Sequence, residues 1–192
     1  MKTVRIYGTA ANLVFAPPVP PGVEVWAVNA PKHYHRFRPH TKDEYTRWFN
    51  LHSRRHMVET YPRGYQWFAT QTKPIVLQEV QADISASVAF PREEILRHFG
   101  VRYFTFSGAW LFALAIYEGF ERIEFYGFSL RDKPQRPHSC YKFERPCFFY
   151  WSEVAKARGI TVVWPQDVED IKDKTPGDPT AYAGPLYGYE TT

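Results

Sequence analysis

One segment in the second half of the chain restricts the fold more than any other. Residues 103–106 are a short aromatic run that predicts a strand, and the pair Ser107-Gly108 predicts a turn. Residues 109–118 are nearly all apolar, and a helix without a polar face has to be buried. Residues 122–126 predict the next strand. A strand, a buried helix and a second strand form a βαβ unit, which implies parallel strands.

The remaining pattern also alternates between strands and helices. Strands are predicted at 4–7, 23–28, 47–51, 74–77 and 160–164, and helices at 64–70, 91–99 and 146–158. The prolines between 17 and 21 limit the first crossover to a turn or two of helix. The polar stretch 131–145 is predicted to be a loop or mobile lid.

The fold class follows from this alternation. We expect a single α/β domain over residues 1–165, Rossmann-like, with a mostly parallel sheet and flanking helices. Prolines and glycines dominate residues 166–192, which are predicted to form an extended C-terminal tail packed on the domain.

Several protein classes do not fit this sequence. The two cysteines, Cys140 and Cys147, are too few for a disulfide framework or a thiolate zinc site. No signal peptide is visible, and no apolar run approaches the ~20 residues needed to span a bilayer. We therefore expect a soluble cytoplasmic protein with no membrane partner.

Small or hydrogen-bonding residues follow the predicted strands. In open parallel sheets, ligands bind beyond the carboxyl ends of the strands, so this row predicts a pocket for a polar ligand. The residues are Gly8, Thr9, Asn12, Asn29, His52, Gln78, Glu79, Ser107, Gly108 and Ser129.

We expect part of this row to bind a nucleotide, namely Gly8, Thr9, Asn12, Asn29, Ser107, Gly108 and Ser129. Three places in the row show how. Backbone N–H groups at the Gly8 turn can cradle an anion, although an ordinary β-turn looks the same. The pair Ser107-Gly108 can hold a phosphate at a helix N-terminus, or Ser107 can simply cap its own helix. Asn29 can hydrogen-bond a base or ribose, or cap the following loop.

Positive charge gathers between residues 32 and 63. This stretch contains eight of the Lys and Arg residues, opposed by three acidic residues, in a chain of net charge +4. Such a field favours an anionic partner, either a nucleotide phosphate or nucleic acid, and a solvated loop face is the alternative. Arg145, at a predicted helix start, can reach a phosphate or pair with Glu144 or Glu153.

Two histidines are candidate general bases. His52 follows a predicted strand end, and His138 lies in the predicted loop 131–145. His56 follows His52 by four residues, which is the spacing of a metal pair on a helix. No third ligand is evident nearby, so we predict no metal site.

Several stretches of the sequence resemble known protein families. The stretches from Phe106 to Ile116, Gly119 to Ile123 and Tyr126 to Ser129 resemble bacterial CMP-sialic-acid-dependent sialyltransferases and the related archaeal pterin diphosphokinase-like proteins. Those families also open with a strand, a small-residue glycine turn and a second strand that ends in Asn, as Gly8 and Asn29 do here.

Small bacteriophage proteins of the same superfamily resemble most of the chain. The shared features are the helix start at residues 104–107, the Tyr-Gly-Phe strand end at 126–128, Glu144-Arg145-Pro146, the strand from Gly159 to Val162, and Leu186 to Glu190. This resemblance implies a phage protein that works in the cytoplasm of a bacterial host.

The resemblance to the sialyltransferases implies a nucleotide held by Gly8, Asn29, Ser107 and Gly108. It also implies a catalytic histidine in the lid, where His138 is the only histidine. Two features depart from the family pattern. The first turn reads Gly-Thr-Ala-Ala-Asn instead of Gly-x-Gly-Pro-Ser, and Ser129 stands where an acidic residue is expected.

Three functions are therefore open. The favoured one is a nucleotide- or nucleotide-sugar-dependent transferase, glycosyltransferase-like, with the nucleotide as substrate and no certain cofactor. The second is diphosphokinase-type transfer to a hydroxymethyl group, which would use Mg²⁺ held by Glu79, Asp83 or Asp132. The third is a non-catalytic phage protein that binds nucleic acid through residues 32–63, or a host protein. The oligomeric state stays open.

Overall fold

The computed structural model describes residues 1–29, 31, 41–130, 141–164 and 166–189. They form one sheet of seven strands in the order β5-β4-β3-β2-β1-β6-β7, and every adjacent pair is parallel. The predicted Rossmann-like α/β fold is confirmed. The strands are β1 (Thr3–Tyr7), β2 (Glu24–Val28), β3 (Arg47–Asn50), β4 (Ile75–Leu77), β5 (Ser87–Ala89), β6 (Arg122–Tyr126) and β7 (Thr161–Val163).

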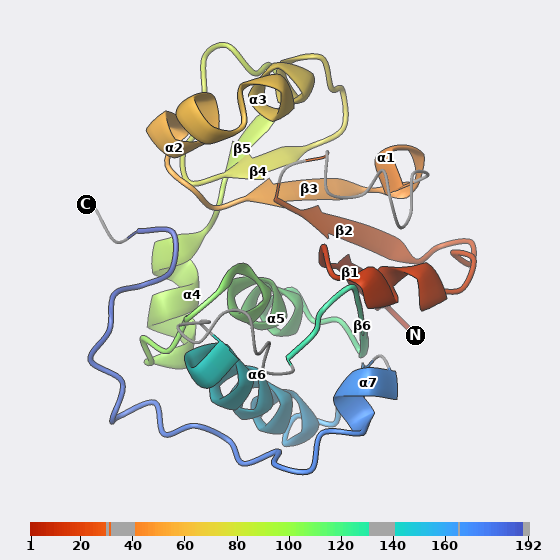
Figure 1. The fold of residues 1–192 in the computed structure, drawn as a ribbon, viewed down its shortest axis with the longest axis vertical. Helices are drawn as coiled ribbons and strands as arrows, with labels where there is room; N and C mark the ends of the chain where they lie inside the picture. The colour runs from red at the N-terminus through yellow and green to blue at the C-terminus, as the bar shows by residue number, and fades with distance from the viewer. Residues whose placement is uncertain (30, 32–40, 131–140, 165, 190–192) are drawn as a thin grey trace.

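Helices cover both faces of this sheet (Figure 1). One face carries α2 and α3, and the other carries α4, α5 and α6. The helical segments are the 3-10 helix η1 (Ala11–Phe15), α1 (Thr41–Glu44), α2 (Arg54–Thr60), α3 (Pro62–Ala69), α4 (Arg92–Phe99), α5 (Ser107–Tyr117), α6 (Tyr141–Lys156) and α7 (Gln166–Glu169). None of the helices in the described part is long and apolar enough to cross a membrane.

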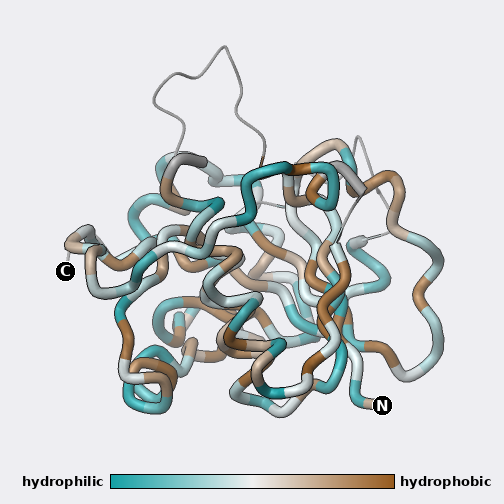
Figure 2. The backbone as a smooth tube through the Cα atoms, turned by 90° about the horizontal axis from the view of Figure 1, so that it is seen from below, coloured by the Kyte–Doolittle hydropathy of each residue, from teal (hydrophilic) through white to brown (hydrophobic). Residues whose placement is uncertain are grey.

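The core consists of two layers separated by the sheet. Val4 and Ile6 of β1 pack into the layer that contains α5 and α6. Tyr7 of the same strand packs into the layer that contains residues of α2 and α3. This alternation follows from the two-residue period of a strand. Figure 2 shows hydrophobic segments running through the middle of the molecule.

The apolar helix is buried, as the sequence predicts. Every residue of α5 from Ser107 to Ile116 is buried, because the helix lies between the sheet and its neighbours α4 and α6 (Figure 1). Trp110 of α5 stacks on Phe104, with ring centroids 3.6 Å apart. The indole N–H of Trp110 donates to the carbonyl of Tyr187, at 3.1 Å.

The strand predicted at residues 103–106 is wrong. The segment is not part of the sheet, and its carbonyl groups find other partners. The indole N–H of Trp151 donates to the Tyr103 carbonyl at 2.9 Å, and the N–H of Tyr187 donates to the Phe104 carbonyl at 2.9 Å. Bonds to α6 and to the tail replace the ladder bonds of a strand, which satisfies the buried backbone.

Helix α6 begins five residues before the predicted start at Pro146, inside the stretch predicted to be a loop. The first four N–H groups of a helix have no intrahelical partner, so a proline just past them disturbs few helical bonds. Pro146 is the sixth residue of α6, so it removes only one or two helical bonds. The sequence also did not predict the short elements α1, α2, β5 and α7.

The C-terminal segment crosses the edge of the sheet after α7. It passes α6 and α4 and ends on the side of α2 (Figure 1). The amide of Gln78 donates to the carbonyl groups of Leu51 and Gly188, which ties the tail to the ends of β3 and β4. Four-residue α7 aside, residues 166–189 contain no helix or strand.

Two glycines bring the loops after β1 and β6 into direct contact. A Cβ at Gly8 would lie 2.3 Å from the carbonyl oxygen of Gly127, and a Cβ at Gly127 would lie 2.5 Å from that of Gly8. Gly127 also has φ +76, a conformation that favours glycine. No larger residue fits this contact without separating the loops.

We expect Gly127→Ala to lower the free energy of unfolding by about 2–3 kcal/mol, because it adds a steric clash to left-handed backbone. Gly119→Ala is the matched control, since Gly119 has φ +73 and open space around its Cβ position. Urea denaturation measures both. Equal losses in the two variants would contradict a role for the contact between the loops.

A buried ion pair supports the proline-rich crossover. The guanidinium of Arg5 donates to Glu124 at 2.7 Å, and both side chains are buried. The same guanidinium donates to the carbonyls of Pro17 and Pro18, at 2.9 and 2.8 Å. Burial alone would raise the pKa of Glu124, but hydrogen bonds from Arg122 and Arg5 hold that pKa below its usual value.

A carboxyl group with a lowered pKa stabilises the fold above its unfolded pKa, and this contribution is lost as pH falls through the folded pKa. We therefore expect Glu124→Gln to cost about 2–3 kcal/mol at pH 7, and the difference from wild type to shrink below about pH 4. Denaturation at several pH values measures it. The exposed Glu59→Gln is the control, and a difference independent of pH would contradict the assignment.

Candidate functional site

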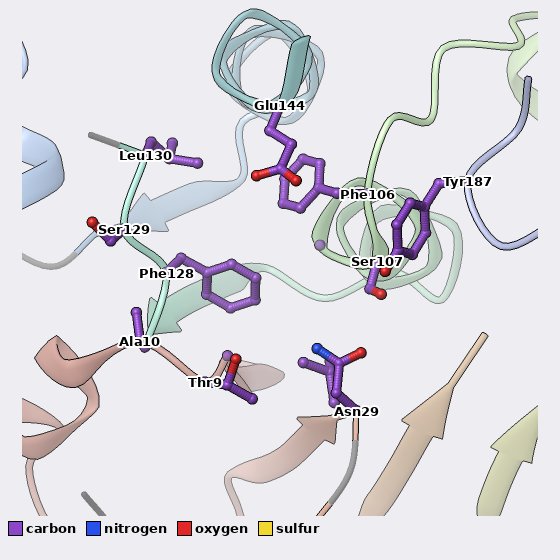
Figure 3. A pocket seen from close by; sticks show the side chains of 14 residues that line it. Thr9, Ala10, Asn29, Phe106, Ser107, Phe128, Ser129, Leu130, Glu144 and Tyr187 are labelled. Atoms are coloured by element: carbon purple, nitrogen blue, oxygen red, sulfur yellow. The ribbon is translucent and has the colours of Figure 1, made fainter. Parts of the chain in front are cut away.

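A pocket of about 340 Å³ lies at the carboxyl ends of β1, β2 and β6, beside the N-terminus of α5. Figure 3 shows side chains from these elements, from α6 and from the tail around it. Six of the predicted nucleotide-binding residues line this pocket: Gly8, Thr9, Asn29, Ser107, Gly108 and Ser129. The structure therefore brings together residues that are up to 121 positions apart in the sequence.

Two N–H groups of the Gly8 turn bond to the end of β6 and the loop that follows it. The N–H of Gly8 donates to the Tyr126 carbonyl, and the N–H of Ala10 donates to the Gly127 carbonyl, both at 2.8 Å. These two groups hold the loops together instead of facing a ligand. Gly8 contributes to the site through its lack of a side chain, which lets the loops after β1 and β6 share one wall.

Helix α5 points its N-terminus into the pocket. Ser107 is the first residue of α5, and no side chain caps the helix. The alternative that Ser107 caps its own helix is therefore not observed. The first N–H groups of a helix and its dipole favour an anion. Gly108 is required by packing, since a Cβ there would lie 2.4 Å from the Phe106 ring and 2.8 Å from that of Phe128.

Asn29 presents an amide to the pocket from the end of β2 (Figure 3). Its backbone is fixed at φ +65, because its N–H donates to the Phe49 carbonyl at 2.9 Å and its carbonyl accepts from the Trp48 indole at 2.7 Å. Its Oδ1 atom is buried and meets no hydrogen-bond donor in the described part of the chain. The amide is thus well placed to contact a ligand.

Two predicted nucleotide-binding residues lie outside the lining. The Asn12 amide donates to the carbonyl of Phe128 at 2.8 Å, which braces the loop after β6 from behind. The Arg145 guanidinium donates through Nε to the carbonyl of Leu130 at 2.8 Å. It braces the end of the same loop.

The predicted bases are placed differently from each other. His52 does not line the pocket, but its Nε2 lies 3.3 Å from the hydroxyl of Tyr187, and Tyr187 does line it. His138 lies outside the described residues. The rings of His52 and His56 are 4.6 Å apart, and no group of three potential metal ligands occurs within the described ranges.

Sequence reasoning missed Glu144 and did not assign Tyr187 to the pocket. Glu144, in the first turn of α6, lines the pocket together with the rings of Phe106, Phe128 and Tyr187. The sequence signal for Glu144 was its place beside Arg145, where it was considered only as an ion-pair partner. The role of Tyr187 depends on where the tail crosses the sheet, which no local pattern reveals.

Other predicted features lie apart from this pocket. Glu79 lines a separate cavity of about 540 Å³ near α2 and α4, and Asp83 accepts from Arg54 at 3.0 Å. Asp132 lies outside the described residues. Cys147 is buried, and burial raises the pKa of its thiol to about 12, which leaves it protonated and unreactive at neutral pH.

Two arginines in the described part of the basic stretch are paired with acidic side chains. Residues 32–40 lie outside the described part of the chain. Within the rest of the stretch, Arg47 pairs with Glu24 and Glu118 at 2.8 and 2.5 Å, and Arg55 pairs with Glu59 at 2.9 Å.

The fold and the pocket at its strand ends define a Rossmann-like α/β protein with a pocket at the usual ligand position of such sheets. Comparison with protein-family models gives no match, and comparison with curated proteins gives none. Several solved structures are similar to this chain, and the three reported below share its fold at 14–16% identity. They belong to the sialyltransferase CstII from Campylobacter jejuni.

Three structures of that enzyme illustrate the similarity. The complex with the substrate analogue cytidine-5'-monophosphate (CMP) has a TM-score of 0.51 and 16% identity, over 86% of this chain and 80% of that one. The complex with CMP-3FNeuAc has a TM-score of 0.52, 16% identity and the same coverage. A single-site variant with CMP has a TM-score of 0.52 and 14% identity, over 85% and 81% of the chains.

We expect Asn29→Ala to unfold at lower denaturant than Asn29→Gly, with a difference of about 1 kcal/mol, because alanine is strained at positive φ and glycine is not. Urea denaturation of the two variants measures this. Both variants lack the amide, so the comparison separates backbone strain from loss of the side chain. Equal stability would show that the backbone at the end of β2 relaxes.

Proposed function

We propose that this chain binds a nucleotide in the pocket at the ends of β1, β2 and β6, and that it acts as a glycosyltransferase-like transferase on a nucleotide-sugar. The observation that carries the proposal is the strand order. From β1 the sheet extends through β2 in one direction and through β6 in the other. Open α/β sheets bind their ligands at such a switch point, where this pocket lies.

The pocket offers a complementary group for each part of a nucleotide. The uncapped N-terminus of α5 at Ser107 and Gly108 suits a phosphate. The amide of Asn29 suits a base or a ribose hydroxyl. The rings of Phe106, Phe128 and Tyr187 provide flat apolar surface for a base or sugar ring.

The similar solved structures support the same ligand class. The CstII sialyltransferase is described in complex with CMP and with CMP-3FNeuAc, and this chain shares its fold. We extend this to the present chain as a proposal: the nucleotide part is the first recognition element, and the sugar part lies towards Glu144 and the tail.

Four predictions from the sequence concern features other than this pocket. These are the bacteriophage origin, the link to pterin diphosphokinase-like proteins, the cytoplasmic location, and binding of nucleic acid or a host protein. Glu79 and Asp83 lie apart from the pocket, so the pocket gives Mg²⁺-dependent phosphoryl transfer no support. His52 and His138 stay candidate bases.

We expect CMP to raise the melting temperature of the protein, because a ligand present at 100 times its Kd adds about 2.7 kcal/mol of stability. Ser107→Asp should weaken CMP binding at least tenfold. Its carboxylate repels the phosphate while favouring the helix N-terminus, so the fold is retained. Isothermal titration with CMP, and with the other nucleoside monophosphates, measures both effects.

Ser53→Asp is the matched control, because Ser53 caps α2, where aspartate is a good substitute, and it does not line this pocket. Binding of no nucleotide to the wild-type protein would refute the proposed function. Equal weakening by Ser53→Asp would show that net charge, and not the α5 N-terminus, controls affinity.

A further inference from the structure

We propose that Glu144 is the catalytic base of this pocket, the group that removes the proton from the acceptor hydroxyl. The inference rests on the proposed glycosyltransferase-like function and assigns a chemical role within it. The sequence singles out His52 and His138 as candidate bases, whereas the charge and position of the groups that line the pocket favour Glu144.

Glu144 is placed by a rigid frame. It lies in the first turn of α6, and each of its neighbours is tied to another part of the fold. The Thr105 hydroxyl donates to the Phe143 carbonyl at 3.2 Å, and Arg145 donates to the Leu130 carbonyl at 2.8 Å. The N–H of Gly177 donates to the Pro146 carbonyl at 2.9 Å. Such support holds a functional side chain in one geometry.

The carboxylate points into the pocket (Figure 3). In that view it faces the space between the Phe106 and Phe128 rings, with Asn29 on the opposite wall and Ser107 to one side. The ligand space therefore lies between an anion-attracting helix N-terminus and an acidic side chain.

Glu144 is the only Asp, Glu, Lys, Arg or His side chain that lines this pocket in the described part of the chain. A carboxylate repels the phosphate of a nucleotide, so it weakens binding of the donor in the ground state. The phosphate is then drawn towards α5, and Glu144 is left facing the sugar and the acceptor. A group that opposes binding can still accelerate the reaction if it acts only in the transition state.

The step balances without a cofactor. The carboxylate of Glu144 takes the proton of the acceptor hydroxyl as the hydroxyl oxygen forms a bond to the anomeric carbon. The bond between that carbon and the donor phosphate oxygen breaks, and its electron pair leaves on the phosphate of the free nucleotide. Glu144 then releases its proton to solvent. When water is the acceptor, the same step hydrolyses the donor.

The test uses the full chain and measures nucleotide release from CMP-sialic acid, UDP-glucose and GDP-mannose, with water as acceptor. Glu144→Gln is nearly isosteric and should lower kcat by about 10²–10⁴-fold. It should bind CMP as well as wild type or more tightly, because a repulsive charge is gone. The wild-type rate should fall as pH is lowered and the carboxylate is protonated, and Glu144→Gln should lack this acidic limb.

Two further variants sharpen the result. Glu144→Ala should recover activity when formate is added, because formate replaces the missing carboxylate, which a purely structural defect would not allow. Glu153→Gln removes an exposed carboxylate from the same helix, where it pairs with Lys156, and serves as the matched control for net charge.

Each outcome decides the assignment. Full turnover by Glu144→Gln overturns the assignment. So does an acidic limb of the pH profile that persists in Glu144→Gln but disappears in His52→Asn or His138→Asn. Both outcomes leave nucleotide binding intact. Weaker CMP binding by Glu144→Gln, with unchanged kcat, overturns it in favour of a ribose-binding role. Failure of the wild-type protein to turn over any donor also overturns it. If CMP does not bind at all, the proposed function fails as well.

Discussion

The contact between Gly8 and Gly127 is the constraint on which the site depends. β1 and β6 are neighbours in the sheet, and their exit loops can share one wall only if neither carries a side chain at the point of contact. At this contact, the N–H groups of Gly8 and Ala10 donate to the carbonyls of Tyr126 and Gly127. Under the proposed function, these two groups are not available to an anion, and the N-terminus of the buried helix α5 supplies further N–H groups.

The same logic explains how much the sequence could predict. A long apolar run such as α5 leaves only one solution, a helix buried against a sheet, and the alternation of strands and helices predicts the parallel sheet. The βαβ unit predicted over residues 103–126 does not form, because its first strand is not part of the sheet. Residues that follow strand ends are brought together by the topology itself. For this reason Asn29 and Ser129 could be predicted to share a pocket without knowledge of their contacts. Ser107 joins them from the N-terminus of α5, although the strand predicted before it does not form.

What could not be predicted depends on partners distant in sequence. Residues 103–106 have the composition of a strand, but their carbonyls bond to Trp151 and to the tail, and tertiary contacts override local propensity. Asn12 and Arg145 have side chains suited to a ligand, yet each is directed to a backbone carbonyl of the loop after β6. Only the fold determines whether a polar side chain meets a ligand or a carbonyl.

The hydrogen bonds that direct Asn12 and Arg145 to the loop after β6 also affect the electrostatic character of the pocket. With Arg145 bonded to Leu130, no cation of the described chain lines the pocket. Under the proposed function, the attraction for a phosphate then comes from backbone dipoles at the start of α5. The effect of a helix dipole is confined to about one helical turn. Under the proposed function, the phosphate faces the start of α5 and the carboxylate of Glu144 faces the acceptor, which is the separation of roles that transfer from a phosphate to a hydroxyl needs.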